Sequence, residues 1–200
     1  FSTLPDQPLY LHDEHDMNVP DEERRGLWDF VEGEVRWEKS IRTYDNGGGD
    51  VDEMIEVVLL DGVDAANCTV TLYNGNNGNS YNTFVVGTEF TAGETGSGYT
   101  IYSIILPSNG LQNGAPDGLC LDIGGAVAHF ISYEGTMTAN NGPAAGMTSV
   151  DIGVEENGGT TIGSSLGLVG DGAGSPDGYT WAVLADLASP GSANDGQTIS

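Results

Sequence analysis

The sequence contains no lysine or arginine after Arg42. All five basic residues of the 200-residue chain lie between Arg24 and Arg42, whereas 19 of the 30 acidic residues follow Arg42. A nucleic-acid ligand requires basic side chains to replace the counterions of its phosphates, and anionic lipid attracts the same side chains. The long acidic part of the chain is therefore not expected to bind nucleic acid or to dock directly on anionic lipid.

Long apolar runs are also absent. No stretch of 18 apolar residues occurs, so no membrane-spanning helix is predicted. Charged residues make up only 18% of the chain, while 31 of the 200 residues are glycine. This composition is typical of short strands and tight turns. The acidic surface has two readings: adaptation to a saline setting, or attraction of Ca²⁺ or of a basic protein partner.

Cysteine is scarce, and Cys68 and Cys120 are the only two in the chain. Two cysteines in a glycine-rich chain of β type are typical of one disulfide formed in an oxidising compartment. Two buried thiols are the alternative. We expect a Cys68–Cys120 disulfide and a secreted or extracellular-surface location, with the lumen of an organelle of the thylakoid type as the second location.

From Ile41 onward, strand-like runs alternate with turn signals such as Asn-Gly, Asp-Gly and Gly-Gly. The pattern predicts an all-β fold, an antiparallel β-sandwich of about seven or eight strands. The clearest strand-like runs span residues 54–60, 68–73, 99–106, 118–123, 127–133, 165–169 and 179–184.

The two ends of the chain lack this rhythm. Residues 1–36 contain Pro5, Pro8 and Pro20 and read as an extended acidic arm, rich in aromatic residues near its end. Residues 37–188 form the expected sandwich, and residues 189–200 an irregular tail. Six apolar side chains are candidates for binding a protein partner: Leu9, Tyr10, Leu11, Trp28, Phe30 and Trp37. The last three have an alternative, which is packing back on the sandwich.

Several motifs in order along residues 41–185 resemble those of lamin-tail-like domains. They are IRTYDN (41–46), GDVDEMIE (49–56), TLYNGN (71–76), PSNGLQNG (107–114), PDG (116–118), SYEG (132–135), NGPAAGM (141–147) and Trp181. The resemblance implies an immunoglobulin-like β-sandwich of extracellular and surface proteins, which binds or positions other molecules and is not itself catalytic. The chain departs from the pattern at Cys68, where the family often has a tryptophan.

Calcium is the ligand that the sequence favours most. Asp45, Asn46, Asp50, Asp52 and Glu53 place oxygen donors around a glycine-rich loop, and Ca²⁺ takes six to eight such donors. Turn chemistry alone is the alternative explanation, since Asp and Asn are common beside Gly in turns. No other cofactor is indicated.

Catalytic motifs are matched only in letters. Residues 163–167 read Gly-Ser-Ser-Leu-Gly, but a nucleophile elbow requires a helix after the serine and a later histidine, and all three histidines precede Ser165. Glu53 and Glu56 lie three apart in a strand-like run, so their side chains are expected on opposite faces. We expect no enzyme and no catalytic residues.

Two functions follow as expectations. The first is a non-catalytic structural or interaction subunit, which assembles into a larger extracellular or lumenal complex through its N-terminal arm and the edges of its sandwich. The alternative is a calcium- or carbohydrate-binding accessory module of a secreted hydrolase or nuclease. Exposed tyrosines would then form a glycan platform, with Tyr73, Tyr81, Tyr99 and Tyr102 as the candidates.

Overall fold

The computed structural model describes residues 53–96, 98–112, 116–156, 160, 163–172, 178–185 and 190–199. The chain divides into two compact units, Phe1–Val35 and Arg36–Ser200, and every described residue belongs to the second. Among the described residues, no helix is long and apolar enough to cross a membrane.

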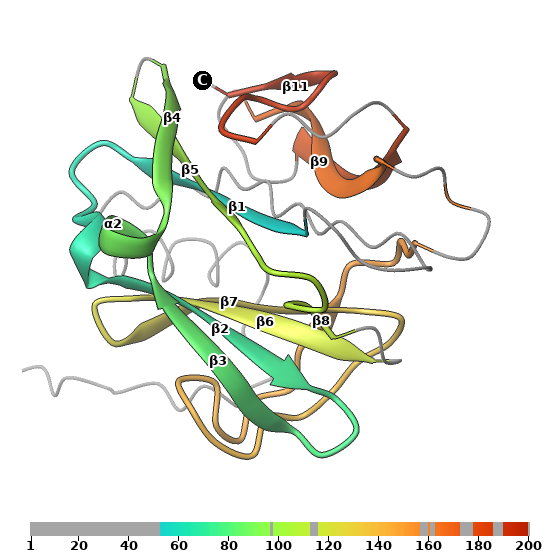
Figure 1. Ribbon diagram of the computed structural model, residues 1–200. Helices are drawn as coiled ribbons and strands as arrows, with labels where there is room; N and C mark the ends of the chain where they lie inside the picture. The colour runs from blue at the N-terminus through green and yellow to red at the C-terminus, as the bar shows by residue number, and fades with distance from the viewer. Residues whose placement is uncertain are drawn as a thin grey trace, which may run out of the picture. The chain divides into compact units, whose positions relative to one another are not determined.

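The described residues form three β-sheets (Figure 1). The first has the order β1-β5-β4 and contains β1 (Met54–Leu60), β4 (Thr91–Thr95) and β5 (Tyr99–Ile105). The second has the order β3-β2-β6-β7-β8 and contains β2 (Cys68–Asn74), β3 (Asn79–Val85), β6 (Asp117–Ile123), β7 (Ala126–Tyr133) and β8 (Val150–Asp151). The third has the order β10-β9-β11 and contains β9 (Ser165–Asp171), β10 (Tyr179–Leu184) and β11 (Gln197–Thr198).

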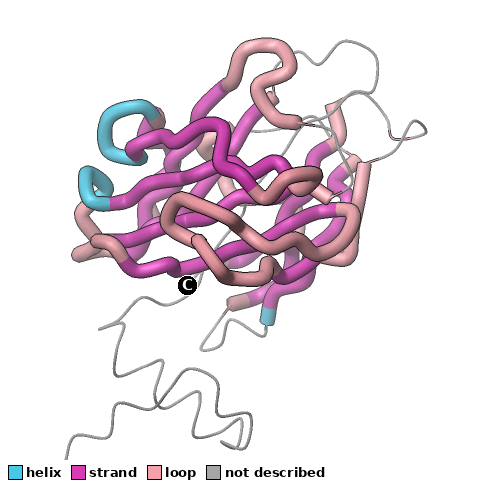
Figure 2. Tube along the Cα trace, turned by 90° about the horizontal axis from the view of Figure 1, so that it is seen from below, coloured by secondary structure: helices cyan, strands magenta, loops and turns pink. Residues whose placement is uncertain are grey.

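Neighbouring strands are antiparallel except for two short parallel pairs, β7 with β8 and β9 with β11. Two short helices, η1 (Ala65–Asn67) and α2 (Val86–Glu89), lie at the same end of the strands (Figure 2). The predicted all-β antiparallel sandwich is confirmed. All seven runs predicted as strands are strands, within one to two residues at their ends.

The main core lies between the first two sheets. On β2, Val70 and Leu72 face this core, while Tyr73 faces the opposite side, because successive side chains of a strand point to opposite faces. Thirteen buried side chains form the core: Ile55, Val57, Leu59, Cys68, Val70, Leu72, Phe84, Val86, Phe90, Leu106, Leu111, Leu119 and Leu121. Trp181 of β10 also packs against it.

Strand β1 is buried on both faces. Val57 contacts the main core, whereas Val58 packs on the other side with Tyr99, Ile101 and Ala193. This double burial explains why residues 54–60 are almost continuously apolar instead of alternating.

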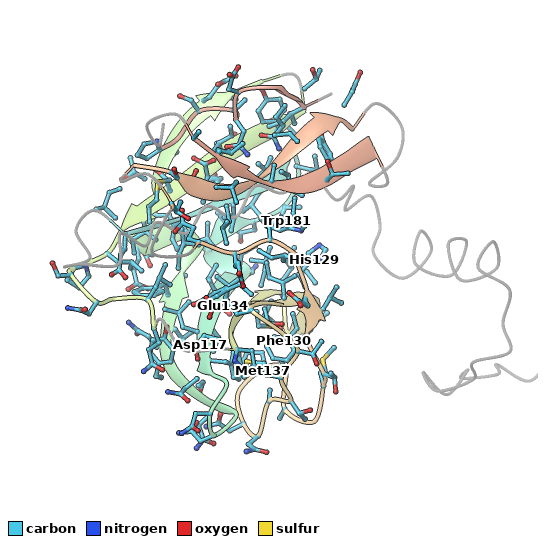
Figure 3. The ribbon with its side chains drawn as sticks, turned by 90° about the vertical axis from the view of Figure 1, so that its right-hand side faces the viewer. Asp117, His129, Phe130, Glu134, Met137 and Trp181 are labelled. Atoms are coloured by element: carbon cyan, nitrogen blue, oxygen red, sulfur yellow. The ribbon has the colours of Figure 1, made fainter. Side chains whose placement is uncertain are left out.

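The outer face of the second sheet is covered by the loop of residues 134–149. Tyr73, Cys120 and Phe130 meet Met137 and residues Ala139 and Ala144 of this loop, and we call these six residues the outer cluster (Figure 3). The rings of Tyr73 and Phe130 lie 5.1 Å apart between centroids.

Residues 190–199, part of the expected irregular tail, are mostly turns and irregular backbone, but they pack against the sheets. Gln197 and Thr198 pair in parallel with β9, Asn194 is 3% exposed, and the N–H of Gly191 donates to Oε2 of Glu56 at 2.6 Å. Glu56 is fully buried in β1, so this contact holds the segment on the outer side of the first sheet. Low apolar content concealed the role of these residues, because they are held by hydrogen bonds.

The expected disulfide is wrong, because both cysteines carry buried thiols. Cys68 contacts the main core, whereas Cys120 belongs to the outer cluster on the other face of the same sheet. Cys68 lies opposite Ile123 in the β2–β6 register, three residues from Cys120, which is about 10 Å along the strand. A disulfide requires Cα atoms within about 7 Å and side chains on the same side.

We predict that Tyr73→Phe destabilises the protein by about 1–3 kcal/mol, because the buried N–H of Ala144 loses its acceptor, the Tyr73 hydroxyl at 3.1 Å. The matched control is Tyr102→Phe, which removes the hydroxyl of a half-buried ring and should change stability by less than about 0.5 kcal/mol. Urea unfolding of the two variants measures both values. Equal midpoints for the two would refute the role of this hydroxyl.

We also predict that Cys68 in the folded protein resists alkylation by iodoacetamide below pH 9. Burial, with the Asp64 and Asp122 carboxylates adding to it, raises the pKa of its thiol from 9.0 to about 11, and only the thiolate is nucleophilic. The unfolded chain therefore loses this proton first. The stability due to the neutral thiol is complete below pH 9 and falls between pH 9 and 11, by at most about 1.4 kcal/mol per pH unit.

Mass spectrometry of alkylated peptides, with the urea-unfolded chain as the reference, checks the reactivity of Cys68. Modification at the same rate in folded and unfolded protein would contradict the prediction. Cys68→Ser should also flatten the loss of stability above pH 9.

Candidate functional site

Polar side chains gather at the end of the sandwich where β2 and β7 finish and β6 begins. Asp117 at the start of β6 pairs in register with Asn74 at the end of β2 and with Tyr133 at the end of β7. We call this region the polar end and define it by Glu53, Asn74, Tyr81, Gln112, Asp117 and Tyr133. Its side chains bind one another and the backbone of two loops, and for that reason we take it as the candidate site.

Glu53 anchors the loop that follows β5. Its side chain is fully buried, and Oε2 accepts hydrogen bonds from the N–H of Gly110 at 2.5 Å and of Leu111 at 3.3 Å. Its backbone carbonyl accepts from the N–H of Leu106 at 2.7 Å. Glu53, immediately before β1, therefore holds both ends of residues 106–111, which we call the anchored loop.

Asp117 holds the turn between β2 and β3. Its side chain is 2% exposed, and Oδ1 accepts a hydrogen bond from the N–H of Gly75 at 2.8 Å. A Cβ atom at position 75 would lie 1.5 Å from the carbonyl oxygen of Pro116, so no side chain fits there. The glycine lets the turn approach closely enough for the carboxylate to reach its backbone.

Gln112 connects the two tyrosines of the polar end. Its N–H donates to the Tyr81 hydroxyl at 3.1 Å, and its carbonyl accepts from the Tyr133 hydroxyl at 2.7 Å. The Asn74 amide donates to the side-chain oxygen of Gln112. The residue that follows the anchored loop is thus fixed by side chains from β2, β3 and β7.

The electrostatics of this end are dominated by carboxylates. Burial, together with the negative charges of Asp117 and Glu53, raises the pKa of Tyr81 to about 12, although the hydrogen bond from Gln112 lowers it. Among the described residues, backbone N–H groups donate to both buried carboxylates and help to stabilise their charge.

Backbone strain also concentrates at this end. Asn109 and Glu134 have φ angles of 58° and 61°, and among the described residues they are the only non-glycine residues in the left-handed region. Asn109 precedes Gly110 in the anchored loop, and Glu134 directly follows Tyr133 (Glu134 and Asp117 are labelled in Figure 3). Such conformations persist only where the surrounding contacts hold them. The polar end can therefore fix the shape of two surface loops.

Of the five proposed calcium ligands, one lies among the described residues. Asp45, Asn46, Asp50 and Asp52 lie outside them. Glu53 lies inside them, but its Oε2 is occupied by two backbone N–H groups. In the described part of the chain, no three His, Cys, Asp or Glu side chains are grouped so that they could hold a metal ion. The calcium site stays a prediction.

Six residues were proposed to bind a partner, and all of them also lie outside the described residues: Leu9, Tyr10, Leu11, Trp28, Phe30 and Trp37.

Ser165 of the elbow-like motif is the first residue of β9 and is fully buried. It is therefore followed by a strand and not by the helix that a nucleophile elbow requires. Glu53 and Glu56 bind different segments, the loop after β5 and Gly191, so they do not share a site.

The tyrosine platform that we expected for a glycan-binding module is wrong. Tyr73 is fully buried in the outer cluster, Tyr99 is 7% exposed and packs with Val58, and Tyr81 and Tyr102 pack against the main core. These four rings are packed in three different clusters. The alternation of a strand puts Tyr73 on the face opposite Val70, but the sequence does not show that a later loop covers that face.

No family model matches the chain, and neither does any curated protein or solved structure.

Sequence reasoning identified Glu53 as a possible ligand and missed the anchoring roles of Glu53 and Asp117. A usable signal was present, because Asp117 directly precedes a glycine at the start of a strand and Glu53 directly precedes an apolar strand. Backbone N–H groups of turns are donors to look for beside an acidic residue at such a position.

We predict that Glu53→Ala destabilises the protein by about 2–4 kcal/mol, because two backbone N–H groups lose a charged acceptor. Glu53→Gln keeps one oxygen acceptor and should cost less than the alanine change. Glu155→Ala is the matched control, since Glu155 is exposed. Chemical unfolding measures all three, and the anchoring role is refuted if Glu53→Ala and Glu155→Ala unfold at the same urea concentration.

Proposed function

We propose that the chain is a non-catalytic structural and interaction subunit, which assembles into a larger extracellular or lumenal complex through its N-terminal arm and the edges of its sheets. The observation that carries the proposal is the use of the buried polar side chains. Glu53, Glu56 and Asp117 each bind the backbone of a loop or turn, and the serine of the elbow-like motif is buried in a strand. These groups give a rigid body whose loops keep a fixed shape.

The edges of the sheets differ in what they offer a partner. Three N–H groups of the edge strand β3 donate to side chains: Ser80 to Asn141, Thr83 to Asn82, and Val85 to Glu89. The outer side of β4 is bound by the C-terminal segment, because the N–H of Glu94 donates to the carbonyl of Gly191 at 2.6 Å. Blocked edges of this kind protect a sheet against unwanted strand addition.

Strand β10 is the edge that we propose for contact with a partner. It is six residues long and terminal in its sheet, and it carries Val183, which is 43% exposed. Strand addition at an exposed edge supplies main-chain hydrogen bonds, and an apolar side chain beside it adds specificity. The negative charge of the chain after Arg42 favours a partner with basic side chains. The extracellular or lumenal location rests on the resemblance to lamin-tail-like domains.

We predict that the chain, purified gently from its native source, elutes with a mass well above 20.8 kDa in size-exclusion chromatography with light scattering. Substitution of Leu9, Tyr10 and Leu11 together by serine should release the chain from the complex. Val183→Lys should weaken the complex, because it places a charge on the proposed contact edge.

The matched control is Ile105→Lys, which changes an apolar side chain that is 51% exposed on β5, the central strand of its sheet. It should leave the complex intact. A natively purified chain of monomeric mass would contradict the proposed function, and equal effects of the two lysine variants would contradict the role of β10.

A further inference from the structure

Four Asn-Gly pairs lie wholly within the described residues: Asn74-Gly75, Asn77-Gly78, Asn109-Gly110 and Asn141-Gly142. In such a pair, the backbone nitrogen of the glycine can attack the side-chain carbonyl carbon of the asparagine, because glycine has no Cβ to hinder the approach. The attack requires a nitrogen whose N–H is not held by another acceptor. It also benefits from a donor on the asparagine oxygen, where negative charge develops.

Three of the four glycine N–H groups are held. The N–H of Gly75 donates to Asp117 at 2.8 Å, that of Gly78 donates to the carbonyl of Asn74 at 2.7 Å, and that of Gly110 donates to Glu53. In the first and third pairs the acceptor is a buried carboxylate. Attack by these nitrogens would first break a hydrogen bond that fixes the turn.

The fourth pair differs in both respects. Within the described part of the chain, the N–H of Gly142 has no acceptor, and its carbonyl accepts from Ala145 at 3.2 Å. Oδ1 of Asn141 accepts a hydrogen bond from the N–H of Ser80 at 2.7 Å, which polarises the carbonyl carbon that the nitrogen must attack. Both residues are exposed to solvent, so water can reach the product.

We propose that Asn141 is a site of spontaneous deamidation through a succinimide. A bond forms between the nitrogen of Gly142 and Cγ of Asn141, the bond from Cγ to Nδ2 breaks, and ammonia leaves with the proton of the Gly142 N–H. The N–H of Ser80 stabilises the negative oxygen of the tetrahedral intermediate. Water then opens the five-membered ring at either carbonyl and leaves aspartate or isoaspartate at position 141.

The product changes a loop that supports the outer cluster. Asn140 is tied to the β2–β3 turn, with its N–H donating to the carbonyl of Gly78 at 2.7 Å, and the N–H of Ala144 donates to Tyr73. Isoaspartate adds one atom to the main chain between these two fixed points. The new carboxylate also lies at the β3 edge and adds a negative charge to a part of the chain that has no lysine or arginine.

The wild-type chain contains the controls for the test. The full-length protein is incubated at mildly alkaline pH, and peptide mapping by mass spectrometry follows the gain of one dalton at each of the four asparagines. In folded protein, Asn141 should deamidate at least about tenfold faster than Asn74, Asn77 and Asn109, which matches the cost of breaking one held hydrogen bond. In the urea-unfolded chain the four rates should become similar.

Two results would overturn the proposal. One is a rate at Asn141 in folded protein no higher than that of the three other pairs. The other is aspartate as the only product, because ring opening must give isoaspartate as well. Asn141→Gln, which would need a less favourable six-membered ring, should abolish the modification at this position and leave the three other rates unchanged.

Discussion

A hydrogen bond between a buried carboxylate and the backbone N–H of a glycine recurs at four places among the described residues. Glu53 binds Gly110, Glu56 binds Gly191, Asp117 binds Gly75, and Asp122 binds Gly125. A buried charge is costly unless it is paired or hydrogen-bonded. Turn backbone supplies a donor to each of these four carboxylates, so the shape of the turns and the burial of the acids depend on each other.

These carboxylate–glycine hydrogen bonds hold loops and the C-terminal segment against the sheets. The bond to Glu56 holds the C-terminal segment over one face of β1, and the bond to Glu53 holds the loop that follows β5. The loop of residues 134–149 covers the far face of the second sheet through Tyr73 and the outer cluster. A body closed in this way leaves its edges as the places for contact, and two of them, β3 and β4, are already occupied by the chain itself.

The strands could be predicted because their apolar character follows from burial. Strand β1 is continuously apolar because it is covered on both faces, and β2 alternates because threonines share its outer face with Tyr73. Strand β3 could not be predicted, since it is a polar edge strand in which Phe84 is the one buried side chain. The disulfide failed because the facing of Cys68 and Cys120 depends on the pairing register, which connects residues far apart in the sequence. Glu53 was recognised as chemically unusual, but its partner lies 57 residues away.

Amide hydrogen exchange, read residue by residue by NMR, tests this dependence most directly. The N–H groups of Gly75, Gly110 and Gly191 lie in turns and loops, where amides ordinarily exchange quickly. Held by buried carboxylates, they are expected to exchange as slowly as the core amides of β2 and β6. Exchange as fast as that of Gly62, in the exposed turn after β1, would contradict the account.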